Sequence, residues 1–257
     1  MAKRKKSMAV DMSSEHRKNI AKCIEFIGRK HSRWKVFSDF LAIAAISISN
    51  NCAPYYTDAE EKIRTEREKR YLKIIGNYDK HERMLFMSMF TELVEELQSY
   101  CPCRESVHLT DVLGELFHEL NFNDAWKGQF FTPQCVCDLM SEMTLGDGES
   151  YKKIIAEKRY FTVNEPCCGG GAMIYGLANT MNKIGLNYNK EVLVFASDID
   201  ERCIFMTYIQ CSLYGIPAII QQKNSLSNEY LSPPWFTPLF HLYNWRWSDL
   251  WKESAEK

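Results

Sequence analysis

The segment with the clearest capacity for chemistry is a glycine-rich turn that follows an acidic residue. Residues 163–173 have the sequence VNEPCCGGGAM, in which an expected strand ends at Glu165 and an expected helix begins after Gly171. Glycine lets the backbone turn tightly and approach a ligand closely, and the N-terminus of the following helix would face that ligand. The residues expected at this site are Glu165, Pro166, Cys168, Gly169, Gly170 and Gly171. Alone, such a turn is equally typical of an ordinary strand-to-helix loop.

Polar residues also follow the next two expected strands, at 192–197 and 218–221. Ligands of open α/β sheets bind at the carboxyl ends of the strands, so these residues should lie near the turn. Asp198 is the better candidate to accept hydrogen bonds from both hydroxyls of a ribose, whereas Asp200 is equally suited to cap the next helix. The other residues expected to border a bound nucleoside are Ile199, Asn224 and Ser225.

The pattern of the turn separates two classes of nucleoside ligand. A dinucleotide fingerprint has the form G-x-G-x-x-G, which Met173 and Ile174 do not complete after Gly171. A carboxylate at Glu165 would repel a pyrophosphate but would attract a positively charged amino group. The sequence therefore favours S-adenosylmethionine (SAM) over a dinucleotide.

A second string, KGQFFTP at 127–133, precedes another expected helix, and with it the chain resembles a known family. Residues 111–143 resemble the entry to the catalytic domain of the adenine-specific DNA methylases, typified by the modification subunits of type I restriction systems. In that family a G-Q-x-F-T-P string folds over the bound SAM and precedes a D-P-x-C-G-S-G turn, which NEPCCGGGAM resembles. The strings ASDIDERCIFMTYIQCSLYGI and KNSL continue the similarity to about residue 226.

The resemblance implies specific cofactor contacts. Glu165 and the glycines would hold the methionine end of SAM, and Asp198 would hold its ribose. Glu165 replaces the commoner Asp, and Gly170 replaces the usual Ser or Thr, which would remove one hydroxyl contact. The residues of the second string expected to line the SAM site are Gln129, Phe130, Phe131, Thr132, Pro133 and Gln134.

These methylases also need a catalytic string of the form Asn/Asp/Ser-Pro-Pro-aromatic. Its polar residue and a backbone carbonyl accept hydrogen bonds from the target amine, and its aromatic ring stacks on the flipped base. The matching residues are Ser232, Pro233, Pro234 and Trp235. Serine is more typical of enzymes that act on cytosine's amine, and the preceding residues 227–231 are too polar and short for a buried strand.

A structural alternative for this string is a proline-rich turn that packs aromatic residues onto the sheet. The aromatic residues between 235 and 251 could equally form a partner interface, because such residues are enriched there. Few residues follow Trp235, so the methylase fold is expected to be truncated at its C-terminus. The catalytic and packing alternatives both remain open at this point.

The elements that must position these residues form an α/β pattern. From residue 127 onward, short apolar runs alternate with helical stretches at 133–143, 172–184 and 201–214, which predicts a parallel, Rossmann-like sheet. Residues 14–126 are expected to be all helical, with Phe86, Phe90, Leu93 and Leu97 on one buried stripe and 58–72 exposed. The expected division is a basic flexible tail (1–13), a helical region (14–126) and a SAM-binding methyltransferase-like domain (127–257).

Composition limits the remaining possibilities. The 257 residues carry a net charge of -1, which is unusual for a protein that binds DNA tightly without help. No apolar run reaches the roughly 18 residues needed to span a membrane, and no secretory signal is expected, so a cytoplasmic location follows. The ten cysteines lack the paired C-x-x-C spacing of a zinc site, so we expect buried thiols and no metal.

The sequence as a whole predicts a SAM-dependent methyltransferase acting on the exocyclic amine of adenine in DNA, in a restriction-modification setting. DNA is the expected substrate, with a specificity subunit, another partner or a second copy of the chain assisting. The alternative is a SAM-binding subunit or interaction protein without catalysis. A small-molecule or RNA methyltransferase remains a third possibility, because a fold alone does not determine the substrate.

Overall fold

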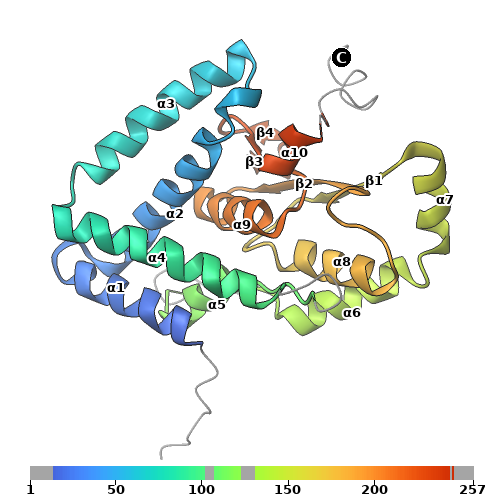
Figure 1. Cartoon of the computed structure of the whole chain (residues 1–257), viewed down its shortest axis with the longest axis horizontal. Coiled ribbons are helices and arrows are strands. Elements are labelled where there is room, and N and C mark those ends of the chain that lie inside the picture. The colour runs from blue at the N-terminus through green and yellow to red at the C-terminus, as the bar shows by residue number, and fades with distance from the viewer. Residues whose placement is uncertain (1–13, 102–106, 123–130, 244, 246–257) are drawn as a thin grey trace, which may run out of the picture.

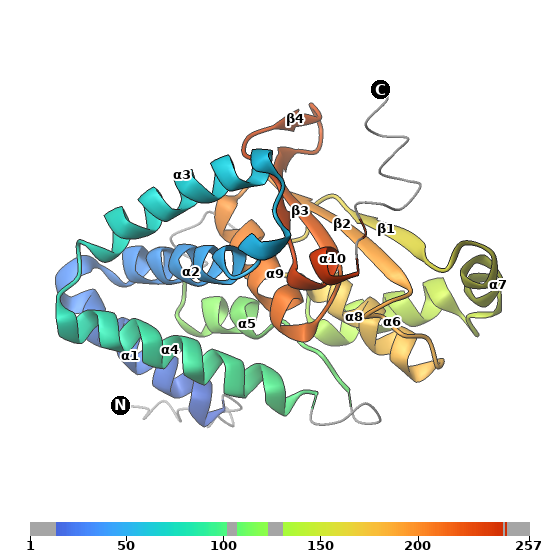
Figure 2. The same ribbon diagram turned by 45° about the horizontal axis from the view of Figure 1, so that its top comes forward.

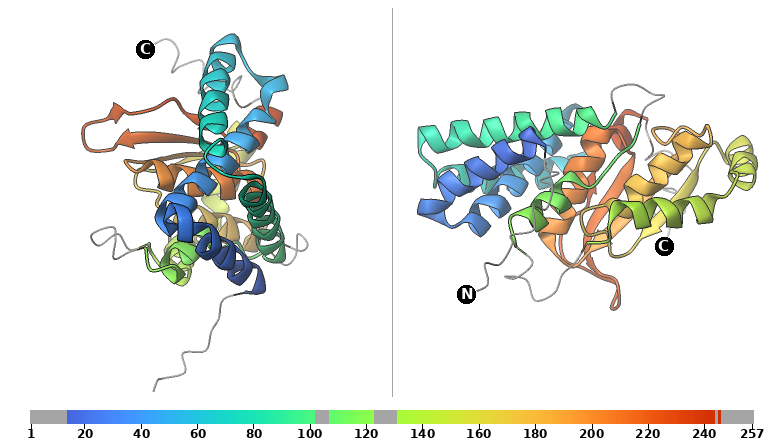
Figure 3. Two further views of the ribbon diagram at one scale, coloured as in Figure 1. Left: turned by 90° about the vertical axis from the view of Figure 1, so that its left-hand side faces the viewer. Right: turned by 90° about the horizontal axis from the view of Figure 1, so that it is seen from below.

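The computed structural model describes residues 14–101, 107–122, 131–243 and 245, and shows a mixed α/β protein (Figure 1). The expected tail at 1–13 lies outside the described residues. Helices of the N-terminal part lie at one end of the molecule, and a sheet with its own helices lies at the other (Figure 3). No helix among the described residues is long and apolar enough to cross a membrane.

The sheet is mostly parallel. Its strands β1 (Phe161–Glu165), β2 (Val192–Asp198) and β3 (Ala218–Asn224) lie side by side in that order. The pairing places Glu165 opposite Ala196 and Asp198 opposite Gln222, so the carboxyl ends of the strands meet at one edge. The three strands predicted from the sequence are confirmed.

Two very short strands extend the sheet beyond β3. The strands β4 (Glu229–Tyr230) and β5 (Trp235–Phe236) both pair antiparallel with β3, β4 near its carboxyl end and β5 near its start. Neither was expected, because two residues are too few to show an alternating pattern.

One face of the sheet is covered by α8 (Ala172–Lys183) and α9 (Glu201–Tyr214), which follow β1 and β2 as predicted. Alternate residues of β2, namely Val192, Val194 and Ala196, join the large hydrophobic core on this side. The helix α6 (Gln134–Leu145), also predicted, packs against α8. The helix α7 (Glu149–Lys158) was not predicted, since it buries no residue and shows no apolar stripe.

The opposite face of the sheet is covered by the segment after β5. Leu193 and Ile219 form a separate cluster there with Phe240 of α10 (Pro238–Leu242) and with Trp245. Because alternate residues of a strand point to opposite faces, β2 contributes to both clusters. This is the aromatic packing that the structural alternative for the C-terminal segment predicts.

The N-terminal part is helical, as expected. Its helices are α1 (Glu15–His31), α2 (Arg33–Asn50), α3 (Asp58–Ile75), α4 (Lys80–Ser99) and α5 (Val112–Glu119), with a short 3₁₀ helix η1 (Ala53–Tyr55). The helix α2 packs on α9 and so connects this part to the sheet, while α3 lies along α2 at the surface (Figure 2).

Local sequence explains where these helices begin and which faces they bury. Thr57 and Asp79 each form a reciprocal capping box with a glutamate three residues later, at the starts of α3 and α4. The predicted stripe of α4 is confirmed, with Phe86, Leu93 and Leu97 buried. The predicted exposure of α3 is confirmed for most of its residues, whereas Glu60 is buried and Arg67 is partly buried.

Candidate functional site

The carboxyl ends of β1, β2 and β3 bring the expected site residues to one edge of the sheet. Glu165 ends β1, Asp198 ends β2 and Asn224 ends β3. The carbonyl of Pro166 accepts a hydrogen bond from Ser225 and another, at 3.3 Å, from Ser197. These contacts connect the three strand ends directly.

The glycine-rich turn adopts a backbone that requires glycine. Gly169 and Gly171 have φ angles of 52° and 101°, in the region that residues with a side chain rarely occupy. The amide of Cys168 donates to the carbonyl of Ser197 at 2.9 Å, which attaches the turn to β2. Gly171 is the N-cap of α8, so this helix begins directly at the turn.

Asp198 supports the turn from the neighbouring strand. Its Oδ2 accepts a hydrogen bond from the amide of Gly169 at 3.0 Å, and its Oδ1 accepts one from the amide of Asp200 at 2.9 Å. Its side chain is nearly buried, and this desolvation raises the pKa of Asp198 above its ordinary value. A carboxylate can accept further bonds at both oxygens, so Asp198 retains capacity for ligand hydroxyls.

The other candidate residues at the ends of β2 and β3 have different roles. Asp200 is the N-cap of α9 and pairs with Arg202 through Oδ2 at 2.7 Å, which is the capping role that the sequence left open. Asn224 accepts hydrogen bonds from the amides of Leu226 and Ser227 within its own turn. Ile199 is 61% exposed beside them and offers an apolar surface at the sheet edge.

The second string reaches the turn through Phe131. A Cβ on Gly169 would lie 3.0 Å from Cδ1 of Phe131, so this ring lies directly over the turn. The ring packs against Phe117 and His118 of α5, and the amide of Phe131 donates to Nε2 of His118 at 3.3 Å. His118 was not predicted from the sequence, because a helical histidine without a motif carries no functional signal.

The other residues of this string take different places. Thr132 and Pro133 are exposed, and Pro133 is the N-cap of α6. Gln134 donates from Nε2 to the carbonyl of Ala172 at 3.2 Å, at the start of α8, while its buried Oε1 has no partner among the described residues. Gln129 and Phe130 lie outside the described residues.

This arrangement has the polar groups that SAM would need. Glu165 and Asp198 are carboxylates suited to an ammonium group and to ribose hydroxyls. The two glycines with positive φ allow the tight backbone of the turn, which lies against the Phe131 ring at Gly169. The start of α8 supplies partial positive charge toward a carboxylate. SAM would add the reactive methyl group, which these residues would bind and orient.

The string Ser232–Trp235 connects β4 to β5, and its aromatic residue lies away from the turn. Trp235 pairs with Ile220 at the outer edge of β3, so two strands separate it from β1. Its side chain is only 5% exposed and packs against Phe205 and Tyr208 of α9. The structure therefore does not bring Trp235 together with the glycine-rich turn.

Arg67 of α3 covers the Trp235 ring. Its guanidinium carbon lies 3.4 Å from the ring centroid, and its Nη2 donates to the carbonyl of Pro234 at 2.9 Å. Burial lowers the pKa of Arg67 from its ordinary value, but the group remains charged at neutral pH. Sequence reasoning missed Arg67, because nothing in a highly charged helix distinguishes one arginine that folds back onto a distant ring.

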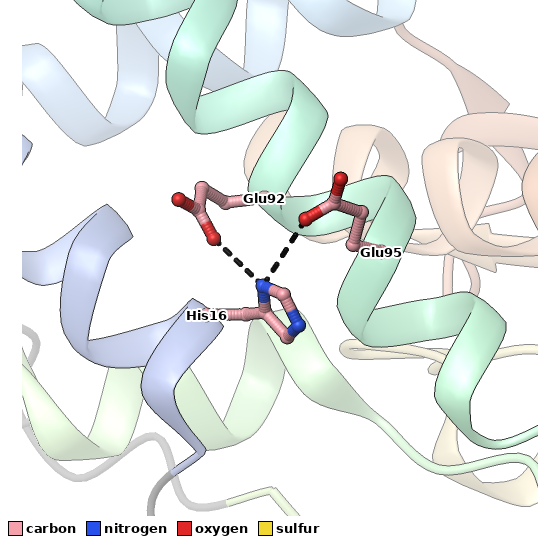
Figure 4. Close-up of side chains that lie close together, drawn as sticks. All are labelled: His16, Glu92 and Glu95. Carbon is pink, nitrogen blue, oxygen red and sulfur yellow. Dashed lines mark hydrogen bonds and ion pairs between the residues drawn. The ribbon is translucent and has the colours of Figure 1, made fainter.

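One group with the ligand types of a metal site occurs among the described residues, far along the chain from the sheet edge. His16 of α1 points toward Glu92 and Glu95 of α4 (Figure 4). Nδ1 of His16 lies 2.7 Å from Glu92 and 3.5 Å from Glu95. The hydrogen bond to Glu92 raises the pKa of His16, as expected for an ion pair. All described cysteines are free thiols, but the expectation that they are buried is wrong for Cys135 and Cys167, which are exposed.

Comparison with known proteins identifies the family. The family model described as N-6 DNA methylase matches residues 108–256, which is more than half of the chain and includes α5, the turn and all strands of the sheet. No curated protein and no solved structure shows a significant match to the chain. On the strength of the family match, the chain belongs to the N-6 DNA methylase family.

Proposed function

We propose that this protein uses SAM to methylate the exocyclic amine of adenine in DNA. The family match supports methylation of DNA adenine. The observation that carries the cofactor assignment is the bond between Asp198 and the amide of Gly169, which joins an acidic strand end to a glycine-rich turn at the edge where ligands of such sheets bind. We also propose that β1, β2 and β3 are the cofactor-binding part of a Rossmann-like core.

In this proposal each part of the edge has a separate task. Glu165 and the turn hold the methionine end of SAM, and Asp198 holds its ribose. Ile199, Asn224 and Ser225 border the adenine. Phe131, with its neighbours in the second string (Gln129, Phe130, Thr132, Pro133 and Gln134), covers the cofactor.

Calorimetric titration with SAM tests the cofactor assignment. We expect the wild-type protein to bind, and Asp198→Ala and Glu165→Gln to weaken binding at least tenfold. The control is Glu157→Gln, which removes a carboxylate from the exposed surface of α7 and should bind as the wild type does. Absence of wild-type binding, or equal binding by all variants, would contradict the assignment.

For the transfer step, Ser232 and a backbone carbonyl of the string would accept hydrogen bonds from the target amine, and Trp235 would stack on the base. The amine nitrogen would take the methyl group and lose one proton to solvent, and S-adenosylhomocysteine would leave. The covering of Trp235 by Arg67 means that a base reaches this face of the ring only after the Arg67 side chain moves away. The buried position of Trp235 favours a second candidate, in which the string is a packing element and the protein is a SAM-binding subunit of a larger methylase.

Methylation of DNA with radiolabelled SAM separates the two candidates. Ser232→Ala removes the hydroxyl while leaving the packing of Trp235 intact. A loss of methyl transfer with unchanged SAM binding would support a catalytic Ser232. Full activity of this variant would assign the string to packing, and no activity in any variant or in the wild type would favour the subunit candidate.

The biological setting is part of the proposal. The type I resemblance suggests restriction-modification, and the net charge of -1 suggests that a specificity subunit, another partner or a second copy assists DNA binding. We further propose that residues 14–126 form the helical part and residues 127–257 the methyltransferase-like part. The helix α5 precedes residue 127 but contributes to the cofactor site of the methyltransferase-like part. A DNA mobility-shift assay at stated salt concentrations, with and without candidate subunits, tests this requirement.

A further inference from the structure

Asp111 is a buried carboxyl that lies between two glycines. It is the N-cap of α5, and only 5% of the residue is exposed. A Cβ on Gly114 or on Gly170 would lie 2.0 Å from its Oδ2, far inside any permitted contact. One glycine belongs to α5 and the other to the glycine-rich turn, so the carboxyl fills the space that both leave open.

A hydrogen-bond network connects this carboxyl to three elements. Its Oδ1 accepts from the amide of Gly114 at 2.8 Å and from Nε2 of Gln210 in α9 at 2.9 Å. The same Nε2 lies 3.0 Å from the carbonyl of Gly170, and Oε1 of Gln210 accepts from the amide of Leu113 at 3.1 Å. Such a network is rigid when all its members are satisfied and costly when one is removed.

The turn is therefore held from its protein side as well as from Asp198. The carbonyl of Gly170 accepts a second bond from the Tyr175 hydroxyl at 2.9 Å, and the carbonyl of Gly169 accepts one from Thr207 at 3.0 Å. Of these supports, only Asp111 comes from outside the strand–helix units of the sheet. It also limits how far Gly170 can move toward α5, because the two are already in contact.

We propose that Asp111 is a positioning residue for the cofactor turn, and that Asp111 and Gly170 act as one unit that sets the position of the turn for SAM. This inference rests on the proposed function, because it takes the turn to be the SAM-binding element. Asp111 does not touch the cofactor in this proposal; it acts through Gly170 and Gln210. The sequence indicated only that Asp111 lies near a helix N-terminus.

If Asp111 and Gly170 act as one unit, the effects of substituting them on SAM binding should not be additive. Asp111→Ala removes the filler and an acceptor for Gln210, so the turn loses its support and SAM binding should weaken about tenfold or more. Gly170→Ala forces a Cβ against the carboxyl and should abolish measurable binding. In the double variant the Cβ occupies space that the carboxyl has left, so it should bind SAM more tightly than Gly170→Ala alone.

Two further variants separate positioning from folding. Asp111→Asn keeps the shape and Oδ1, and should bind SAM within about threefold of the wild type. Glu96→Ala removes another buried carboxyl, which pairs with Arg17 between α1 and α4. It should lower the melting temperature without changing SAM affinity, whereas Asp111→Ala should change both.

The experiment is calorimetric SAM binding and thermal unfolding of these proteins side by side. The inference is overturned if Asp111→Ala folds and binds as the wild type does, or if the double variant binds no better than Gly170→Ala. Should Asp111→Ala fail to fold, three other variants decide. Asp111→Asn should bind SAM, whereas Gly170→Ala and Gly170→Ala/Asp111→Asn should both fail to bind, since the bulky amide cannot relieve the clash. Binding by Gly170→Ala/Asp111→Asn would overturn the inference. Absence of wild-type binding overturns the proposed function and this inference together, whereas unchanged binding by the variants overturns the inference alone.

Discussion

Replacing Trp235 with alanine should destabilise the protein strongly, whether or not the residue takes part in catalysis. The ring is 5% exposed and contacts Phe205 and Tyr208 with centroid distances of 5.4 and 5.1 Å. Truncating a buried tryptophan costs about 3–5 kcal/mol. The substitution also leaves Arg67 without the ring that it covers.

A loss of this size is easily measured. In a chain of this length each kcal/mol lowers the melting temperature by about 2–4 °C, so a loss of about 4 kcal/mol predicts a decrease of about 8–16 °C. Urea unfolding followed by circular dichroism gives the free energy of unfolding independently. The control is Tyr230→Ala in β4, whose ring is 59% exposed and whose loss should cost under about 0.5 kcal/mol.

The result that would refute the packing argument is a Trp235→Ala variant within about 1 kcal/mol of the wild type. Trp235→Phe supplies the complementary test, because it keeps an aromatic ring with a smaller loss of volume. If methyl transfer survives in this variant while stability falls moderately, the ring matters by packing or stacking and not through its indole nitrogen.

Two further predictions concern pH. Burial raises the pKa of Asp111 from 3.8 to about 6; Glu115 also raises it, and His118 lowers it. The folded state therefore binds this proton more tightly than the unfolded state. The stability contributed by protonated Asp111 is present below about pH 4 and is lost as pH rises to about 6, by up to about 3 kcal/mol. The free energies of unfolding of the wild type and Asp111→Asn, measured in urea, should therefore diverge over this range. A constant difference between them would contradict the argument. His16 has a raised pKa because of Glu92, so its ion pair stabilises the folded state below pH 6.5 and this contribution disappears as pH rises through the raised pKa. His16→Ala should flatten the stability profile there and exposed His81→Ala should not; equal profiles of the two variants would rule out the ion pair.

Much of the fold could be predicted because it depends on local patterns. The three parallel strands and the helices between them have apolar runs and periodic stripes, and α9 begins and ends at the predicted residues Glu201 and Tyr214. The elements that were missed lack such patterns: α7 has no buried residue, and β4 and β5 have two residues each.

The site could be predicted only where its functional residues follow one another closely in the sequence. The glycine-rich turn and Asp198 can be recognised from their residue types and spacing. Arg67 cannot, because it contacts Trp235 from far along the chain. One local signal did exist for Asp111. Gly114 lies in the first turn of α5, three residues after Asp111, and a glycine at that place in a helix indicates that a side chain is excluded there.

The surface position of α3 has a consequence for how the protein fluctuates. Glu60 is the only buried residue of this helix, and its side chains reach the sheet-bearing part through Arg67 on Trp235 and Arg70 on Glu201. Segments with few buried contacts open far more often than the whole molecule unfolds. Amide hydrogens of α3 should therefore exchange with solvent well before those of α9, and each such local opening would expose the Trp235 ring while the core stays folded.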